Sequence, residues 1–405
     1  MRGYLPRLTH PARAARAIAG AGIAFIVLAA LPRAQSGPEA FIAAIEGPQV
    51  GREGDLATIP LAAALQKAGV PGLSVAVIKD FRIHWTRAYG VADVVTGAPA
   101  TPDTLFQAAS ISKPVTAVAI LKAVEQGQLS LDADVKTFLT SWRVPASEHT
   151  ARQPVTLRGL LSHTSGTDDG FGFPGYEPGA PMPTIVQILN GGPPSNLGPV
   201  LIGRPPLTAF KYSGGGFTLA QLALTDSTRR PFAALLNEWV LGPLGMTSTT
   251  FEQPLPPARE AKAARAHDAK GGSSGARFHV YPELAAAGLW TTAADLARFG
   301  IEVQQSIQGR SNKVISRAMA IEMTTPVGVG PYGLGLEIHK LGEGWYLTHG
   351  GSNWGFQCVL VVHRLKGYGF AAMTNGAAGN VLLRELDDRI AAAYKWDRLD
   401  APLRR

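Results

Sequence analysis

Strand-like patterns lie near both ends of this 405-residue chain, while its long middle has mainly helical and loop patterns. Residues 72–80 and 81–90 predict a two-stranded hairpin, because two short runs rich in β-branched and aromatic residues meet at a turn. Short strands separated by glycine or charged turns are predicted at residues 335–339, 344–348, 356–363 and 369–375, and residues 381–394 have helical spacing. We therefore expect the two ends of the chain to build one sheet layer.

The middle of the chain predicts a second, mostly helical lobe. We expect an α+β fold, with an antiparallel sheet flanked by helices in a lobe over about residues 55–109 and 326–395, and an inserted helical lobe over about 110–325. Apolar residues make up 46% of the chain, which is enough for a sizeable core. Residues 35–405 are expected to form a single domain, with a cleft between the two lobes.

The first 34 residues have the pattern of an export signal. Five arginines and no acidic residue accompany an apolar run that is too short for a comfortable membrane span, and Ala34 offers a small residue for cleavage. We predict cleavage here and a periplasmic or secreted mature protein, with a membrane contact only if the segment stays uncleaved. Removing the five arginines lowers the formal net charge from +8 to +3.

Several classes of function find no support in the sequence. There is no dense stripe of lysine and arginine with interleaved aromatic residues, which argues against nucleic-acid binding. No His-Glu-x-x-His and no paired cysteine and histidine spacing occurs, so neither a metal nor a cofactor is predicted. Cys358 is the one cysteine, and we expect it to pack in the interior because it lies in an apolar strand pattern.

The tetrapeptide Ser110-Ile111-Ser112-Lys113 pairs a nucleophile with a base. It opens an apolar stretch with helical spacing that ends at Gly127. Side chains three residues apart share one face of a helix, so the Lys113 amine is placed to polarise the Ser110 hydroxyl or to accept its proton. The alternative is a surface serine and lysine at the start of an ordinary core helix.

Two later segments carry groups that suit the same site. Tyr212 stands in the segment Phe210–Phe217, which we expect to be a turn because it is too rich in glycine for a helix or a strand interior. Tyr212 is therefore a candidate proton relay, and the alternative is a tyrosine that packs beside a turn. Residues 347–356 contain a glycine pair between two strand patterns, which predicts that another group approaches the backbone there.

These three segments, in this order and at these separations, resemble the serine β-lactamase and penicillin-binding-protein superfamily, and in particular its class C β-lactamase-like serine hydrolases and esterases. The likeness extends from about residue 55 to about residue 395 and includes the stretches 70–77, 127–132, 160–166 and 241–246. The resemblance implies a β-lactamase/transpeptidase-like fold and catalysis through an acyl-enzyme. It also implies a structural loop around His163.

The resemblance implies a role for each matching residue. Ser110 is then the acylated nucleophile, Lys113 its activating base, and Tyr212 the relay that brings a proton to the leaving group. The backbone N–H groups of Ser110 and Ser352 form the oxyanion hole. The residues expected to contact the substrate are His349, Gly350, Gly351 and Trp354.

Two departures from the family pattern bear on the substrate. Where many penicillin-recognising members carry Lys-Thr-Gly, this chain has His349-Gly350-Gly351 and lacks a fixed cation for a substrate carboxylate. The sequence leaves the protonation of His349 open. Gly214 stands where the family's tyrosine turn usually has asparagine, which removes a side-chain amide that would position an acylamide substrate.

We therefore predict an exported serine hydrolase that forms an acyl-enzyme on Ser110 and acts on a small-molecule ester or amide, with small esters preferred. A D-amino-acid peptidase, a carboxypeptidase or a β-lactamase is the alternative among enzymes. The alternative from another class is a catalytically silent module that binds cell-wall peptide or a protein partner through the same cleft.

Overall fold

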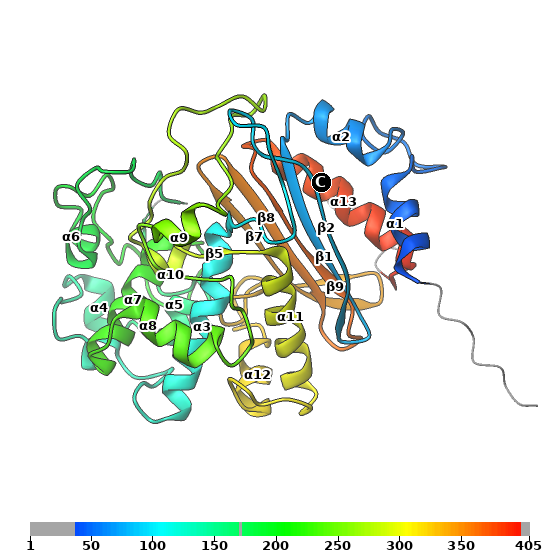
Figure 1. Ribbon diagram of the computed structural model, residues 1–405. Coiled ribbons are helices and arrows are strands. Elements are labelled where there is room, and N and C mark those ends of the chain that lie inside the picture. The colour runs from blue at the N-terminus through cyan, green and yellow to red at the C-terminus, as the bar shows by residue number, and fades with distance from the viewer. Residues whose placement is uncertain (1–36, 170–171, 398–405) are drawn as a thin grey trace, which may run out of the picture. The chain divides into compact units, whose positions relative to one another are not determined.

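A computed structural model describes residues 37–169 and 172–397, and the predicted export signal lies outside these residues (Figure 1). Its main sheet has the strand order β3-β2-β1-β9-β8-β7-β6, and every neighbouring pair is antiparallel. A separate two-stranded ladder joins β4 to β5. The strands are β1 (Gly72–Lys79), β2 (Arg82–Asp93), β3 (Ala98–Pro99), β4 (Phe106–Gln107), β5 (Trp290–Thr291), β6 (Glu337–Leu341), β7 (Gly344–Asn353), β8 (Phe356–His363) and β9 (Gly369–Thr374).

Helices cover both faces of the main sheet and fill the middle of the chain. They are α1 (Pro38–Glu46), α2 (Leu61–Lys67), α3 (Ser112–Glu125), α4 (Glu148–Arg152), α5 (Leu157–Leu161), α6 (Ile185–Asn190), α7 (Gly214–Thr228), α8 (Phe232–Leu236), α9 (Pro257–Glu260), α10 (Leu284–Ala287), α11 (Ala293–Ile307), α12 (Arg317–Met323) and α13 (Gly379–Tyr394). Short 3-10 turns occur at η1 (Ala109–Ile111) and η2 (Val135–Thr137), and a π-helical turn occurs at η3 (Asn237–Leu241).

The predicted α+β fold and its single sheet built from both chain ends are confirmed. Strand β1 from the N-terminal part pairs with β9 from the C-terminal part, so the two ends lie side by side in Figure 1. The pairing explains why β1 is apolar along nearly its whole length. Leu73, Val75 and Val77 pack in the core beneath α1, α2 and α13, whereas Ala76 and Ile78 pack in the core on the opposite face, against α11.

The open edge of β7 positions the candidate site. Strand β6 pairs with β7 only from Gly344 to Thr348, so no strand among the described residues pairs with the outer side of residues 349–353. This part of β7 packs against η1, at the start of the helical region. The sequence predicted a strand that ended at residue 348, but the strand continues through the glycine pair to Asn353.

Gly351 shows why this strand contains glycine. A Cβ atom on Gly351 would lie 2.3 Å from the carbonyl oxygen of Ala108 and 2.4 Å from Sγ of Cys358. No side chain fits there, because both contacts are far inside van der Waals distance. The glycine therefore lets β7 lie directly against the residues that precede Ser110, and the predicted close approach to the backbone is confirmed.

The expectation that the glycine-rich segment after Tyr212 is a turn was wrong for its second half. Gly214, Gly215 and Gly216 form the first turn of α7, which Ser213 caps by accepting a hydrogen bond of 2.7 Å from the Gly216 N–H. Crowding explains the glycines, because a Cβ atom at either of the first two would lie 2.5 Å from a neighbouring side chain.

Within the described residues, no helix combines the length and the apolar character that a membrane crossing requires.

Candidate active site

Ser110 lies in the 3-10 turn η1, directly before α3. The preceding residue, Ala109, has a φ of +48°, which sets the serine at a sharp bend between β4 and the helix. Such a bend costs conformational energy in a residue other than glycine and is typical of functional positions. The Ser110 side chain is partly exposed, whereas Ile111, Ser112 and Lys113 around it are buried. Of the four residues Ser110 to Lys113, a ligand can therefore reach Ser110 only.

Lys113 is a buried amine next to that hydroxyl. Its Nζ lies 3.1 Å from Oγ of Ser110 and donates a hydrogen bond of 2.9 Å to the carbonyl oxygen of Ala286 in α10. Burial lowers the pKa of Lys113 to about 7, against a smaller opposing effect from the Asp169 carboxylate. A large share of the amine is therefore neutral near pH 7, in the form that accepts a proton.

Tyr212 completes the cluster of the three residues that the sequence predicted to act together. Its phenol is hydrogen-bonded to Ser110, and Nζ of Lys113 lies 4.9 Å from the centre of its ring. Burial raises the pKa of Tyr212 well above its ordinary value, so the phenol keeps its proton at physiological pH. A protonated phenol beside the nucleophile is placed to donate a proton to a departing oxygen or nitrogen.

The predicted oxyanion-hole residues lie on η1 and β7, which pack against each other. The residues Asn353 and Phe356 are paired where the β7–β8 hairpin closes, and Ser352 precedes them opposite Gln357. In an antiparallel ladder the backbone groups of alternate residues point to opposite sides, so the N–H of Ser352 points away from β8 toward the open edge. The N–H of Ser110, in the first turn of a helix, needs no acceptor within that helix.

His349 is neutral in this environment, which answers a question that the sequence left open. Burial, together with a smaller effect of the Lys113 charge, lowers the pKa of His349 to about 3. Its Nδ1 lies 2.6 Å from the carbonyl oxygen of Gly350 and must donate a proton there, since a carbonyl only accepts. His349 therefore supplies no positive charge in the place where many family members have lysine.

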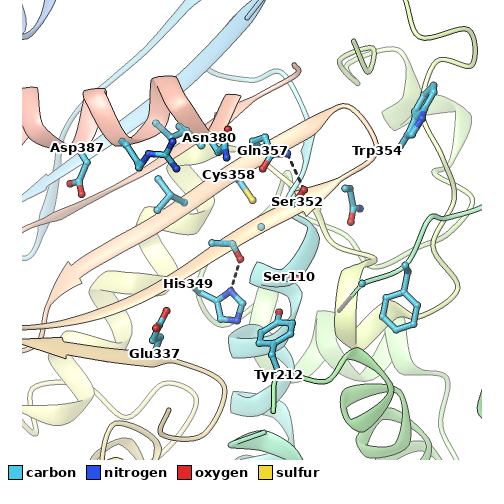
Figure 2. A pocket seen from close by; sticks show the side chains of 18 of the residues that line it. Ser110, Tyr212, Glu337, His349, Ser352, Trp354, Gln357, Cys358, Asn380 and Asp387 are labelled. Carbon is cyan, nitrogen blue, oxygen red and sulfur yellow. Dashed lines mark hydrogen bonds between the residues drawn. The ribbon is translucent and has the colours of Figure 1, made fainter. Parts of the chain in front are cut away.

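A cleft of about 1090 Å³ opens over these groups (Figure 2). Its lining includes Ser110, Tyr212 and the whole segment from His349 to Trp354, so the cleft brings together every substrate-contact residue that the sequence predicted. The Trp354 ring stacks on His279 with 4.1 Å between ring centres and an interplanar angle of 5°. Cys358 is 3% exposed, as expected for a packing residue, but it also lies at the cleft wall.

The sequence analysis missed two residues that support Tyr212. His163 was expected only in a structural loop, yet its ring stacks on Tyr212 with 4.3 Å between centres, and its Nδ1 accepts a hydrogen bond of 3.1 Å from the N–H of Ser213. Asp169 accepts hydrogen bonds from the Ser213 hydroxyl and, at 2.8 Å, from the N–H of Gly215. No local pattern signals these contacts, because the partners lie more than 40 residues apart in the sequence.

Known proteins share this architecture. The model of the Beta-lactamase family matches residues 60–395, a stretch that contains the nucleophile, the tyrosine and the glycine-bearing strand. The chain belongs to the Beta-lactamase family. The matched stretch includes Ser110, Lys113 and Tyr212, whose side chains lie together beside the cleft. Among the described residues, no group of three or more histidine, cysteine, aspartate or glutamate side chains is arranged to hold a metal ion.

Curated relatives of this Beta-lactamase-family chain match only part of their own length. Esterase EstB of Burkholderia gladioli is 32% identical over 198 residues, which cover 46% of this chain and 49% of that protein. Protein flp of Staphylococcus aureus (strain N315) is 28% identical over 189 residues, which cover 47% of this chain and 36% of that protein. The alignments thus span half or less of these relatives.

Solved structures of other proteins have the same fold. The structure of SurE with D-Leu has a TM-score of 0.67 and 24% identity, and the match covers 85% of this chain and 76% of that one. The D-amino acid amidase from Ochrobactrum anthropi SV3, complexed with L-phenylalanine, has a TM-score of 0.65 and 22% identity, with coverage of 84% and 98%. These similarities bear on the fold and leave the substrate to be argued from the site.

Proposed function

We propose that this family member forms an acyl-enzyme on Ser110 and hydrolyses small esters. The observation that carries the preference is the burial of His349, which is 2% exposed and holds the Gly350 carbonyl with Nδ1, so that an uncharged ring stands at the end of the cleft beside Tyr212. A substrate with a carboxylate there, such as a β-lactam or a peptide with a free C-terminus, would be desolvated without a fixed cation to pair with. An uncharged ester carries no such cost, so esters fit this cleft better.

The proposed reaction transfers the acyl group first to Ser110 and then to water. Neutral Lys113 accepts the proton of the Ser110 hydroxyl as Oγ bonds to the carbonyl carbon, and the backbone N–H groups of Ser110 and Ser352 stabilise the oxygen that becomes negative. When the carbon–oxygen bond to the leaving group breaks, Tyr212 donates a proton to the departing alcohol and is reprotonated from Lys113. Water then attacks the acyl-enzyme by the same steps and releases the acid.

The proposed function is tested first by labelling with a fluorophosphonate, which reacts with activated serine nucleophiles. We expect the wild-type protein to be labelled and Ser110→Ala to remain unlabelled. Ser112→Ala removes a buried hydroxyl two residues away in the same segment, and this control variant should still be labelled. If wild-type protein with normal thermal stability remains unlabelled, the silent binding module replaces the enzyme.

Substrate preference is tested with a nitrophenyl ester, a chromogenic cephalosporin and a D-alanyl-D-alanine peptide. We expect the ester to have the highest kcat/KM, by at least about tenfold, because a desolvated and unpaired carboxylate costs more than 1.4 kcal/mol. Comparable turnover of the cephalosporin or of the peptide would favour the β-lactamase or carboxypeptidase alternative.

We also propose that the protein is exported. The support is the composition of residues 1–34, with five arginines, no acidic residue and an apolar run. N-terminal sequencing of the protein from fractionated cells tests this proposal. Mature protein that begins near residue 35 in the periplasm or the medium supports it, and a full-length chain in the cytoplasm contradicts it.

A further inference from the structure

The proposed reaction gives the cleft two ends, one for the acyl group and one for the leaving group. The oxyanion hole fixes the substrate carbonyl between Ser110 and Ser352, and Tyr212 has to reach the departing oxygen. The leaving group therefore lies on the Tyr212 side, and the acyl group extends along β7 toward Trp354. Figure 2 shows this division, with Tyr212, His349 and Glu337 on one side of Ser110 and Trp354 on the other.

Aromatic rings form the walls of the leaving-group end. Phe210 and Tyr332 are stacked with 5.5 Å between their ring centres and an interplanar angle of 20°. The Tyr332 ring also meets Tyr212 and His349 edge to face, at 6.2 Å and 5.9 Å. All four side chains line the cleft. Rings of this kind offer the negative faces of their π systems to a bound cation.

A carboxylate lies at the same end. Glu337, the first residue of β6, lines the cleft, and its side chain is 30% exposed. Its charge reaches the two phenols, because it contributes to the raised pKa values of Tyr212 and Tyr332. Nε2 of His339 lies 2.9 Å from one of its oxygens, which holds the carboxylate in place. The pocket thus combines a fixed negative charge with aromatic walls.

Apart from Lys113, whose amine has a pKa of about 7 and is mostly neutral at pH 8, the positive charge of the cleft lies away from this end. Among the described lining residues, arginine and lysine are represented by Arg384 on α13. Helix α13 lies on the far side of the β7–β8 hairpin from Tyr212 in Figure 2. His349 is neutral, as shown above. A cationic leaving group would meet attraction from Glu337 and the rings, and an anionic one would meet repulsion.

We propose that the leaving-group end of the cleft is a subsite for a positively charged leaving group. The preferred substrates are then esters of amino alcohols or of quaternary-ammonium alcohols, and Glu337 selects against leaving groups that carry a carboxylate. This inference rests on the proposed ester hydrolysis and adds the charge of the leaving group to it. The reaction remains hydrolysis, in which water and the ester give the acid and the free cationic alcohol.

Three butyrate esters of similar size test the subsite: butyrylcholine, its uncharged isostere 3,3-dimethylbutyl butyrate, and 3-carboxypropyl butyrate. Initial rates are measured at pH 8 by titrating the acid released. We expect kcat/KM for butyrylcholine to exceed that of the isostere by about tenfold, the size of a partly desolvated cation–π and carboxylate contact. The carboxylate ester should be slower than the isostere, and both differences should shrink as the salt concentration rises.

Two charge-matched variants locate the effect. Glu337→Gln should bring the ratio of the choline ester to its isostere below about threefold, because it removes the charge and keeps the shape. Asp387→Asn removes the same charge from the same cleft at α13 and should leave the ratio unchanged. Equal losses in both variants would overturn the assignment to Glu337.

The outcomes separate this inference from the proposed function. Rapid hydrolysis of all three esters at equal kcat/KM would overturn the cationic subsite and leave the esterase intact. Failure to hydrolyse any of them, together with failure of Ser110 to react with fluorophosphonate, would overturn the esterase itself.

Discussion

The burial of Lys113 makes a prediction that joins catalysis to stability. The buried amine has a pKa of about 7 in the folded protein, whereas an unfolded lysine holds its proton to about pH 10.5. Between these values the unfolded chain binds more protons than the folded one, so the free energy of unfolding rises with pH. Replacing Lys113 by methionine keeps most of the volume and removes this titration.

The size of the effect follows from the linkage relation. One titrating proton changes the free energy of unfolding by about 1.4 kcal/mol for each pH unit. From pH 7 to pH 9.5 the wild-type protein should therefore gain about 3 kcal/mol of stability relative to Lys113→Met. Other titrating groups cancel in this difference, provided that they are the same in both proteins.

The assay is urea unfolding of both proteins at several values between pH 6 and pH 9.5. Lys122→Met, on the same helix α3, controls for the removal of a lysine. The kcat/KM of the wild-type protein for a neutral ester should rise through about pH 7, as the base loses its proton, and Lys113→Met should be inactive. Stability curves of Lys113→Met and wild type that stay parallel over this range would refute the reasoning.

Three further predictions concern the residues around Ser110. Gly351→Ala should lower kcat/KM by at least about tenfold, because the added Cβ would collide with the Ala108 carbonyl. Gly350→Ala should keep most activity, because the nearest atom to its added Cβ lies at 3.9 Å. Equal losses in the two variants would contradict this reasoning. Tyr212→Phe should slow alkyl esters about a hundredfold more than nitrophenyl esters, which need no protonated leaving group, and a uniform loss would exclude the relay. Asparagine at position 163 can still accept the hydrogen bond from the Ser213 N–H, and it tolerates the φ of +61° that His163 has. His163→Asn should therefore retain more kcat than His163→Val, at similar KM. Equal kcat in the two variants would argue against a positioning role for His163.

Most of the architecture could be read from the sequence because strand patterns are local. Short strand patterns bounded by turns in residues 72–90 and 335–375 marked the main strands of the sheet, and the helix at 381–394 became α13 with two additional residues at its start. The segment Gly214–Gly216 was misjudged, because side-chain capping and crowding by distant residues outweigh the low helix propensity of glycine.

The candidate nucleophile, base and phenol were also identified from the sequence, since Ser110 and Lys113 are separated by one helical turn and Tyr212 follows a recognisable pattern. Their protonation states were not, because a pKa depends on burial and on charges that the fold brings near. The neutral His349, the lowered pKa of Lys113 and the support of Tyr212 by His163 all arise from contacts between distant segments.

The amino-acid sequence by itself determined which chemical groups are available and where the main strands and helices occur along the chain. Only the tertiary structure decided which charges meet in the cleft. Glu337 lies 125 or more residues from Tyr212 and Ser110 in the chain, yet the pairing of β6 with β7 places it at the leaving-group end. Local patterns encode strands and turns, whereas electrostatic selectivity depends on distances that exist only after the chain has folded.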